Sequence, residues 1–331
     1  MESVTSPGVI SEVEVFGILS SHLNQRIIGQ EHLIQSLLIA LISAGHLLVE
    51  GAPGLAKTSA IKELAMCLEG DFQRIQFTPD LLPADLTGTD VFHPEDGSFS
   101  FQPGPIFHNI LLADEINRAP AKVQSALLEA MAEHQVTVGK TTYPLPELFM
   151  VMATQNPIEQ EGTYPLPEAQ LDRFLMYVTI DYPETSAERA ILRLNREEAE
   201  RAARKGTLKV PRITQKIIKE ARRRLFQLHM NPAVEEYLVQ LIMATREPQI
   251  YGDDLARWLR FGASPRGTIS LDRCARAHAW LHKRDYVAPE DIHQVIHDVL
   301  RHRLLLSFEA EAEGITSDKI IDELLNRIAV P

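Results

Sequence analysis

The sequence predicts an α/β domain with a parallel five-stranded sheet over residues 1–183, followed by a small all-helical domain over residues 184–331. Three observations indicate this: apolar runs that alternate with helical patterns, a glycine-containing loop after the first run, and a helical pattern in the second half. Short apolar runs are typical of parallel strands covered on both faces. The runs occupy residues 46–50, 72–77, 109–113, 148–154 and 174–180.

Length and composition match a soluble protein of about two domains. The chain has 331 residues, 45% of them hydrophobic and 24% charged, which is enough apolar sequence for ordered cores. The formal net charge of -12 disfavours a general nucleic-acid binder, which needs basic surface to displace counterions from phosphate. Cys67 and Cys274 lack metal-ligand spacing and indicate buried thiols in a reducing compartment.

The N-terminal residues and the most apolar stretch both argue against export or membrane insertion. The first ten residues, MESVTSPGVI, lack the basic and apolar regions of a signal peptide. Residues 33–49 are apolar but include Gln35 and His46, so a buried helix and strand fit better than a membrane span. We therefore expect a cytoplasmic protein.

Two segments of the first half are expected to be inserts. Residues 78–108 are rich in Pro, Gly and Asp and are too long for a simple connection in a compact domain. Residues 134–147 contain two β-rich stretches, 135–138 and 141–143, around Gly139-Lys140. The second insert therefore predicts a β-hairpin, and the first predicts a functional element.

The second half carries signals for helix starts. Thr185 and Glu188 have the spacing of a capping box, in which the first residue caps the helix. Pro232 and Pro289 stand where the first turn of a helix accepts proline. The sequence contains no internal repeat that would indicate two similar halves.

A phosphate-binding loop is predicted directly after the first apolar run. The segment consists of Gly51, Ala52, Pro53, Gly54, Leu55, Ala56, Lys57 and Thr58. Its glycines let backbone N–H groups turn toward phosphates, the following helix presents its positive N-terminus, and Lys57 adds charge near the β- and γ-phosphates. Thr58 would place its hydroxyl on Mg²⁺. Ala56 departs from the usual pattern, which has glycine there, and the alternative is a glycine turn before a solvent-exposed lysine.

Two acids, Asp114 and Glu115, end the third apolar run. Parallel strands present such carboxylates at the carboxyl edge of the sheet. Asp114 would hold the Mg²⁺ shell, and Glu115 would orient the attacking water, because phosphoryl transfer depends on positioning and charge stabilisation. The alternative is an acidic strand end in solvent.

A second sequence, Gly139-Lys140-Thr141, resembles the end of a phosphate-binding loop. His134 occupies the position of the first glycine, and a short strand follows where the motif requires a helix. We expect a hairpin turn with an exposed lysine there.

Five motifs, in this order, resemble the MoxR family of AAA+ ATPases. They are Ile28-Gly29-Gln30, the phosphate-binding loop, Asp114-Glu115-Ile116-Asn117-Arg118-Ala119, Ala153-Thr154-Gln155-Asn156-Pro157 and Glu168-Ala169-Gln170-Leu171-Asp172-Arg173-Phe174. The resemblance extends from about Leu23 into the helical region. It implies an AAA+ P-loop core of αβα layers, a helical lid, ATP and Mg²⁺ as ligands, ATP hydrolysis, and ring oligomers that are usually hexamers.

The resemblance also implies roles for three further residues. Asn156 resembles the sensor 1 residue, which contacts the γ-phosphate or the attacking water; a buried asparagine that caps a turn is the alternative. Arg173 resembles the arginine finger, which acts on the nucleotide of the neighbouring subunit, so isolated monomers should hydrolyse ATP poorly. A structural pairing with Asp172 is its alternative. Arg266 resembles the sensor 2 arginine of the lid.

Other positions have less specific roles. Ile28 and Gly29 would flank the adenine, or form a simple turn before a helix that starts near Glu31. Arg118 would contact the next subunit or form a surface salt bridge. The resemblance implies that the inserts face partners or substrate. In the first insert, Phe92, Phe99, Phe101 and Phe107 would form a protein-contacting surface or pack locally.

The family resemblance implies a chaperone-like motor that remodels, matures or activates protein complexes, with a protein client and a partner that contains a von Willebrand factor A domain. Three rival functions stay open from the sequence. They are a DNA motor of the related helicase clades, the ATPase subunit of a metal chelatase, and a nucleotide switch that does not hydrolyse ATP. The net charge disfavours the first rival, and the presence of Glu115, Asn156 and Arg173 disfavours the third.

Overall fold

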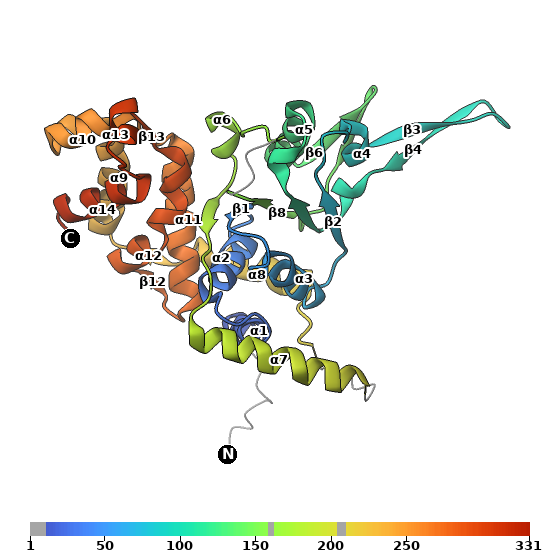
Figure 1. Cartoon of the computed structure of the whole chain (residues 1–331), viewed down its shortest axis with the longest axis horizontal. Coiled ribbons are helices and arrows are strands. Elements are labelled where there is room, and N and C mark those ends of the chain that lie inside the picture. Colours follow the sequence, from blue (N-terminus) through green and yellow to red (C-terminus); the bar gives the residue numbers. More distant parts are fainter. Residues whose placement is uncertain (1–10, 158–161, 204–209) are drawn as a thin grey trace, which may run out of the picture.

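The computed structural model describes residues 11–157, 162–203 and 210–331, and its centre is a parallel five-stranded sheet (Figure 1). The strand order is β2-β5-β8-β1-β9, and every neighbouring pair is parallel. The bounds are β1 Leu47–Glu50, β2 Phe72–Gln76, β5 Ile110–Asp114, β8 Met150–Gln155 and β9 Met176–Thr179. Each predicted apolar run coincides with one of these strands, although β5 and β8 end one residue beyond their runs, and the predicted sheet is confirmed.

Side chains that alternate along the central strands supply two hydrophobic clusters, one on each face of the sheet. In β1, Leu47 belongs to one cluster and Leu48 to the other. Helices α2 (Glu31–Ile42) and α3 (Lys57–Met66) contribute to the first cluster, and α5 (Ala121–Glu133) to the second. Because successive strand residues point to opposite faces, these apolar runs bury both faces at once.

The first insert forms a short helix and a β-hairpin that projects from the body (Figure 1). Helix α4 (Pro83–Thr87) precedes strands β3 (Gly88–His93) and β4 (Ser98–Pro103), and the 3₁₀ helix η1 (Pro105–Phe107) follows them. Gly88 has φ +87°, and a Cβ atom there would lie 2.2 Å from the Gln102 carbonyl oxygen. The sequence indicated an insert, but it did not predict this hairpin.

The second insert is the predicted hairpin, with strands β6 (Gln135–Val138) and β7 (Thr141–Pro144). An aromatic cluster joins the two hairpins: Phe101 stacks on Tyr143 with ring centroids 4.0 Å apart and contacts Phe107 at 5.6 Å. Near the tip of the first hairpin, Phe92 and Phe99 face each other and are 50% and 69% exposed. Local packing therefore accounts for two of the four phenylalanines, and two are exposed.

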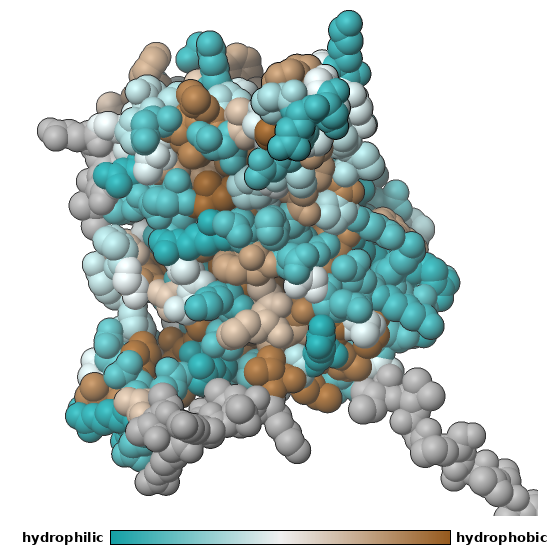
Figure 2. Space-filling view, turned by 90° about the vertical axis from the view of Figure 1, so that its right-hand side faces the viewer, coloured by the Kyte–Doolittle hydropathy of each residue, from teal (hydrophilic) through white to brown (hydrophobic). Residues whose placement is uncertain are grey.

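The side of the molecule from which the first hairpin projects is mostly hydrophilic, with apolar residues in separate groups (Figure 2). No helix in the described parts of the chain combines the length and apolar character that a membrane span requires. Residues 1–10, on which the prediction of no signal peptide was based, lie outside the described residues. Cys67 and Cys274 are both buried, as predicted.

After β9 the chain is predominantly helical, as predicted. The main helices are α7 (Thr185–Ala203), α8 (Gln215–Leu225), α9 (Pro232–Arg246), α10 (Asp253–Trp258), α11 (Pro265–Leu281), α12 (Pro289–Leu300), α13 (Phe308–Ala312) and α14 (Ser317–Arg327). Two pairs of short strands connect them: β10 (His229–Met230) with β12 (Tyr286–Val287), and β11 (Leu259–Phe261) with β13 (Leu305–Leu306).

One predicted helix cap is wrong. Thr185 is the first residue of α7, and the Glu188 N–H donates to the Glu184 carbonyl at 3.0 Å. Thr185 thus lies inside the helix, where it cannot act as the capping residue. The first-turn prolines Pro232 and Pro289 are confirmed at the starts of α9 and α12.

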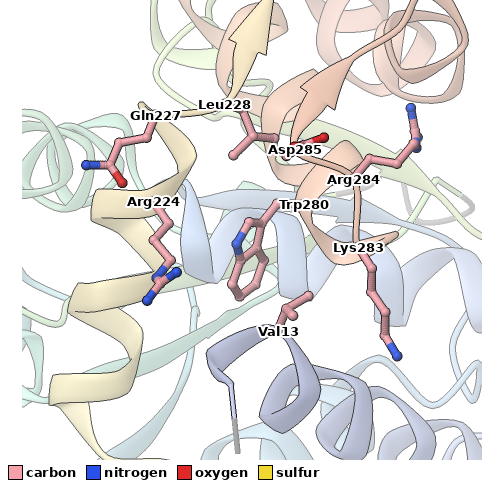
Figure 3. Close-up of a pocket in the computed structure, with 8 residues that line it drawn as sticks. All are labelled: Val13, Arg224, Gln227, Leu228, Trp280, Lys283, Arg284 and Asp285. Atoms are coloured by element: carbon pink, nitrogen blue, oxygen red, sulfur yellow. The ribbon is translucent and has the colours of Figure 1, made fainter.

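The N-terminal helix α1 (Glu12–Arg26) packs against the C-terminal helices. Phe16 meets Trp280 of α11 edge to face, with ring centroids 5.3 Å apart. The Trp280 indole lines a cavity of about 270 Å³ between α1, α8 and the end of α11, and Figure 3 shows the residues around it. Arg224 and Arg284 in its wall pair with Glu12 and Asp291. One hydrophobic cluster therefore runs from α1 into α12, and the domain division at residue 183 stays a prediction.

Candidate nucleotide-binding site

The loop between β1 and α3 has the backbone of an anion-binding loop. Gly54 and Ala56 both adopt positive φ, at 86° and 58°. A Cβ atom on Gly51 would lie 2.4 Å from Ile180, so only glycine fits there. The Ala60 N–H donates to the Ala56 carbonyl, and the N–H groups of the preceding helical residues have no acceptor within α3. These N–H groups are the donors that a bound phosphate satisfies at a helix N-terminus.

Lys57 is the first residue of α3, and its ammonium group lies at the ends of the central strands. Its Nζ donates to the Gly51 carbonyl and, at 3.3 Å, to the Gln155 carbonyl that ends β8. Burial lowers the pKa of Lys57, whereas the nearby charges of Asp114 and Glu115 raise it. A phosphate would add further negative charge and so hold the ammonium in its protonated form.

Asp114 and Glu115 end β5 beside this lysine, and Thr154 of β8 fixes both. The Thr154 hydroxyl donates to Asp114 Oδ1 at 2.6 Å and accepts the Glu115 N–H at 2.9 Å. Glu115 itself has φ 56°, a left-handed conformation that turns the chain directly after the strand. Sequence analysis did not single out Thr154, although it is a hydroxyl residue at the end of an otherwise apolar run.

The neighbouring strand β2 supplies two further contacts that sequence analysis missed. Arg74 donates to Asp114 Oδ2, with Nη2 at 2.6 Å and Nε at 3.1 Å, and Gln76 Nε2 donates to Glu115 Oε2 at 2.6 Å. The signal in the sequence was the presence of polar residues within an apolar strand. Arg118 Nη1 lies 3.0 Å from the same Glu115 oxygen, so the predicted salt bridge of Arg118 is present.

Three further residues predicted to contact the nucleotide, Ile28, Gly29 and Asn156, lie at the same edge of the sheet. A cavity of about 400 Å³ is lined by Gly29, Gln30 and residues 179–184. Gln30 Nε2 donates to the Asp181 carbonyl at 3.1 Å, and α2 begins at Glu31 as expected. Ile28 is half-buried directly before Gly29. Asn156 is buried immediately after β8, next to the Gln155 carbonyl that Lys57 binds.

These residues fit a nucleoside triphosphate with Mg²⁺. The N–H groups at the start of α3 and the Lys57 ammonium match phosphate oxygens. Asp114 and Thr58 carry the hard oxygen donors that Mg²⁺ prefers. When bound, the metal would neutralise charge on the phosphates, and Asp114 and Thr58 are the residues that would hold it.

The structure places Arg173 and Arg266 at the opposite, amino edge of the sheet. The Leu175 N–H donates to the His46 carbonyl at 2.8 Å, so Arg173 lies before the start of β9. Arg173, Arg266, His46 and His134 line one cavity of about 250 Å³. The four residues of β1 separate this cavity from the loop by roughly 13 Å at ~3.3 Å per residue. Neither arginine can therefore reach the phosphate-binding loop of its own chain.

Arg173 does not form the predicted alternative pairing with Asp172. Its Nη1 donates instead to the Leu128 carbonyl of α5 at 2.7 Å. The Asp172 carboxylate binds Arg303 and Ser264. Arg266 lies exposed in the first turn of α11.

Comparisons with known proteins agree with this fold. The family model for ATPases associated with various cellular activities (AAA) matches residues 46–176, and the AAA lid domain model matches residues 256–324. The crystal structure of a candidate ATPase from Cytophaga hutchinsonii has a TM-score of 0.87 at 43% identity, and the match covers 97% of this chain and 96% of that chain.

Among curated proteins, the chain is 43% identical over 328 residues to the chaperone MoxR1 of Mycobacterium tuberculosis, covering 98% of this chain and 84% of the relative. It is 42% identical over 318 residues to YeaC of Bacillus subtilis, covering 96% and 95%. The magnesium-chelatase subunit ChlI of Trieres chinensis is more distant, at 28% identity over 240 residues, covering 70% of this chain and 62% of the relative. With its parallel sheet, phosphate-binding loop and lid helices, the chain belongs to the MoxR family of AAA+ ATPases.

Proposed function

We propose that this protein hydrolyses ATP with Mg²⁺ at sites shared between neighbouring subunits of a ring. The observation that supports this proposal most strongly is the separation of the charged residues between two edges of one sheet. Lys57, Asp114 and Glu115 lie at the carboxyl edge, whereas Arg173 and Arg266 line a cavity at the amino edge. A complete site requires the carboxyl edge of one subunit and the amino edge of the next.

At the carboxyl edge, the loop N–H groups and Lys57 would bind the phosphates. Glu115 would accept a hydrogen bond from the attacking water, and Asn156 would orient that water or the terminal phosphate. Glu115 Oε2 now binds Gln76 and Arg118, so those hydrogen bonds must change before this oxygen can accept one from water. Asp114, fixed by Thr154, would bind the metal directly or through water.

At the amino edge, Arg173 would leave the Leu128 carbonyl and approach the terminal phosphate bound by the neighbouring subunit. Charge neutralisation by such an arginine contributes about 10³–10⁵ in rate. Arg266 would act on the same nucleotide. A contact between two different edges is heterologous, and heterologous contacts form rings when the rotation closes; by resemblance to other AAA+ proteins, we propose a hexamer.

We further propose that the cycle of binding and hydrolysis remodels, matures or activates protein complexes in the cytoplasm. The name of the Mycobacterium tuberculosis relative, a chaperone, supports this role. A protein client and a partner with a von Willebrand factor A domain belong to the proposal. The exposed Phe92 and Phe99 of the first hairpin offer apolar contact area for a protein.

Two rival functions have less support. The chelatase subunit is a distant relative compared with the MoxR proteins. A DNA motor is disfavoured by the net charge of -12, because phosphate contacts require clustered basic residues.

The substitution Glu115→Gln tests hydrolysis apart from binding. It keeps the size of the side chain but weakens its interaction with the attacking water, so we expect retained Mg-ATP binding and turnover reduced by about 10²-fold or more. Glu129→Gln, on the exposed face of α5, is the matched control and should hydrolyse ATP at the wild-type rate. Wild-type turnover by the Glu115 variant would remove this residue from the mechanism.

A further inference from the structure

The two arginines of the amino edge come from distant parts of the chain, yet one carboxylate connects them. Arg173 precedes β9, and Arg266 lies in the first turn of α11. Asp172 Oδ2 accepts a hydrogen bond from the Ser264 hydroxyl at 2.7 Å. Ser264 is the N-cap of α11, and its oxygen also accepts the Arg266 N–H at 3.1 Å. The Ser264 hydroxyl therefore lies between the residue next to Arg173 and the backbone of Arg266.

A buried arginine holds the other oxygen of this carboxylate. Arg303 Nε donates to Asp172 Oδ1 at 2.8 Å, and its side chain is only 1% exposed. Arg303 Nη2 also binds the Phe174 carbonyl at 2.6 Å and the Ser270 hydroxyl at 3.2 Å. Arg303 thus binds residues on both sides of Arg173 and one residue of α11.

The location of this network matches a positioning role. Asp172 and Arg303 line both the 250 Å³ cavity that contains Arg173 and Arg266 and a second cavity of about 570 Å³. Burying a guanidinium costs free energy, which only its carboxylate and carbonyl partners offset. A buried polar network whose members are all satisfied restrains its side chains, and removing one partner would leave the Arg303 guanidinium without part of this compensation.

We propose that Asp172, Ser264 and Arg303 are positioning residues that hold Arg173 and Arg266 as one unit, at a fixed spacing, for the nucleotide of a neighbouring subunit. This inference rests on the proposed function. Within it, the lid and the turn that carries Arg173 move together toward the neighbouring site. Disconnecting Ser264 from Asp172 displaces Arg266 relative to Arg173 while the phosphate-binding loop of the same subunit, at the opposite edge, stays intact.

Two substitutions at Ser264 separate this link from ordinary helix capping. Asn and Asp are both good N-caps, but Asn can donate its amide to Asp172, whereas Asp would repel it. We expect Ser264→Asn to keep most of the turnover and Ser264→Asp to lose about tenfold or more, because small misplacements of catalytic groups are costly. Both should keep the wild-type thermal shift with Mg-ATP. Thr316→Asp, at the N-cap of α14, controls for an added carboxylate.

A mixing experiment makes the effect specific to the neighbouring site. Ser264→Asp subunits have an intact phosphate-binding loop, and Glu115→Gln subunits have intact arginines. Alone, Ser264→Asp should keep about a tenth of wild-type turnover or less, and Glu115→Gln about a hundredth or less. A one-to-one mixture should regain wild-type activity at about a quarter of the interfaces, which are heterologous. A merely structural defect of the Ser264 variant would leave the mixture no more active than the mean of the two variants and would overturn the proposal.

The controls distinguish the failure of this inference from that of the proposed function. If wild-type turnover is independent of assembly and of Arg173, the shared site itself is wrong. If Arg173→Ala is inactive while Ser264→Asp turns over like wild type, only the positioning role is wrong. Should Ser264→Asp not fold, Ser264→Gly removes the hydroxyl with little loss of capping and must give the same loss of turnover.

Discussion

The two edges of the central sheet differ in what they carry and in how the chain builds them. The carboxyl edge holds the loop that follows β1, Lys57 at the start of α3, and the acidic pair at the end of β5. The amino edge presents Arg173 and Arg266, and Asp172, next to Arg173, binds Ser264 and Arg303 from distant segments. Under the proposed function, each edge supplies one half of a site that two neighbouring subunits complete.

The largest expected effect concerns the carboxyl edge. Lys57→Ala removes the ammonium that binds the Gly51 and Gln155 carbonyls and would bind phosphate. Mg-ATP at 100 times its dissociation constant stabilises a folded protein by about 2.7 kcal/mol, and we expect this stabilisation to vanish in a thermal melt. Lys140→Ala, in the hairpin with the similar Gly139-Lys140-Thr141 sequence, should keep it. If Mg-ATP raised the melting temperature of the Lys57 variant as much as that of the wild type, the assignment of the phosphate-binding loop would be refuted.

A smaller effect is expected when the acidic pair loses its common partner. Thr154→Val deletes the hydroxyl that binds both Asp114 and the Glu115 N–H. Leaving a buried polar group unsatisfied costs about 1–3 kcal/mol, so unfolding should begin at lower denaturant and turnover should fall. Thr154→Ser keeps the hydroxyl and is the matched control. Equal turnover by the two variants would mean that Thr154 does not position the pair.

A lower pH should reduce the free energy of unfolding, because two histidines near the amino edge are buried in the neutral form. Burial is the main cause that lowers the pKa of His46 from 6.5 to about 3, and burial lowers the pKa of His302 in the same direction. Between about pH 3 and pH 6.5, His46 is protonated in the unfolded chain but neutral in the folded chain. The free energy of unfolding therefore has its full value above about pH 6.5 and decreases as pH falls.

His46 should contribute at most about 1.4 kcal/mol per pH unit to the slope of the free energy of unfolding against pH. Denaturant titrations at pH 4.5–6.5 should show a smaller slope in His46→Gln, with His302 still contributing. An identical slope in the His46 variant would exclude His46 as a source of the pH dependence.

The smallest effect concerns the departure from the loop pattern. Ala56 occupies the left-handed region at φ 58°, where a Cβ atom is unfavourable by about 1–2 kcal/mol. Ala56→Gly relieves this strain but gains entropy in the unfolded chain, so the net gain should be below about 1 kcal/mol. Ala60→Gly, buried inside α3, should instead destabilise. A lower free energy of unfolding in both variants would show that Ala56 is not strained.

The parts of the fold that depend on local pattern could be predicted from the sequence. The five strands and the β6–β7 hairpin follow from apolar runs and turn residues, and the positions of Lys57 and Asp114 follow from those strands. The β3–β4 hairpin was missed because its strands are largely exposed, so they show no apolar alternation.

Contacts that depend on strand order could not be predicted. Arg74 meets Asp114 only because β2 and β5 are neighbours, with Gln76 paired to Asp114. Likewise, Asp172 and Arg303 are 131 residues apart and meet only in the folded chain. The alternative that paired Arg173 with Asp172 was based only on their adjacent positions in the sequence. In the folded chain, Arg303 binds the Asp172 carboxylate instead.

The most direct test of the shared site is the ATPase rate per subunit against protein concentration, for the wild type and Arg173→Ala, with mass measured in parallel. Arg193→Ala, on the exposed face of α7, is the matched control. We expect the wild-type and control rates to rise with assembly and the Arg173 rate to stay about 10³-fold lower in assemblies of equal mass. A rate that is independent of concentration and of Arg173 would contradict the account.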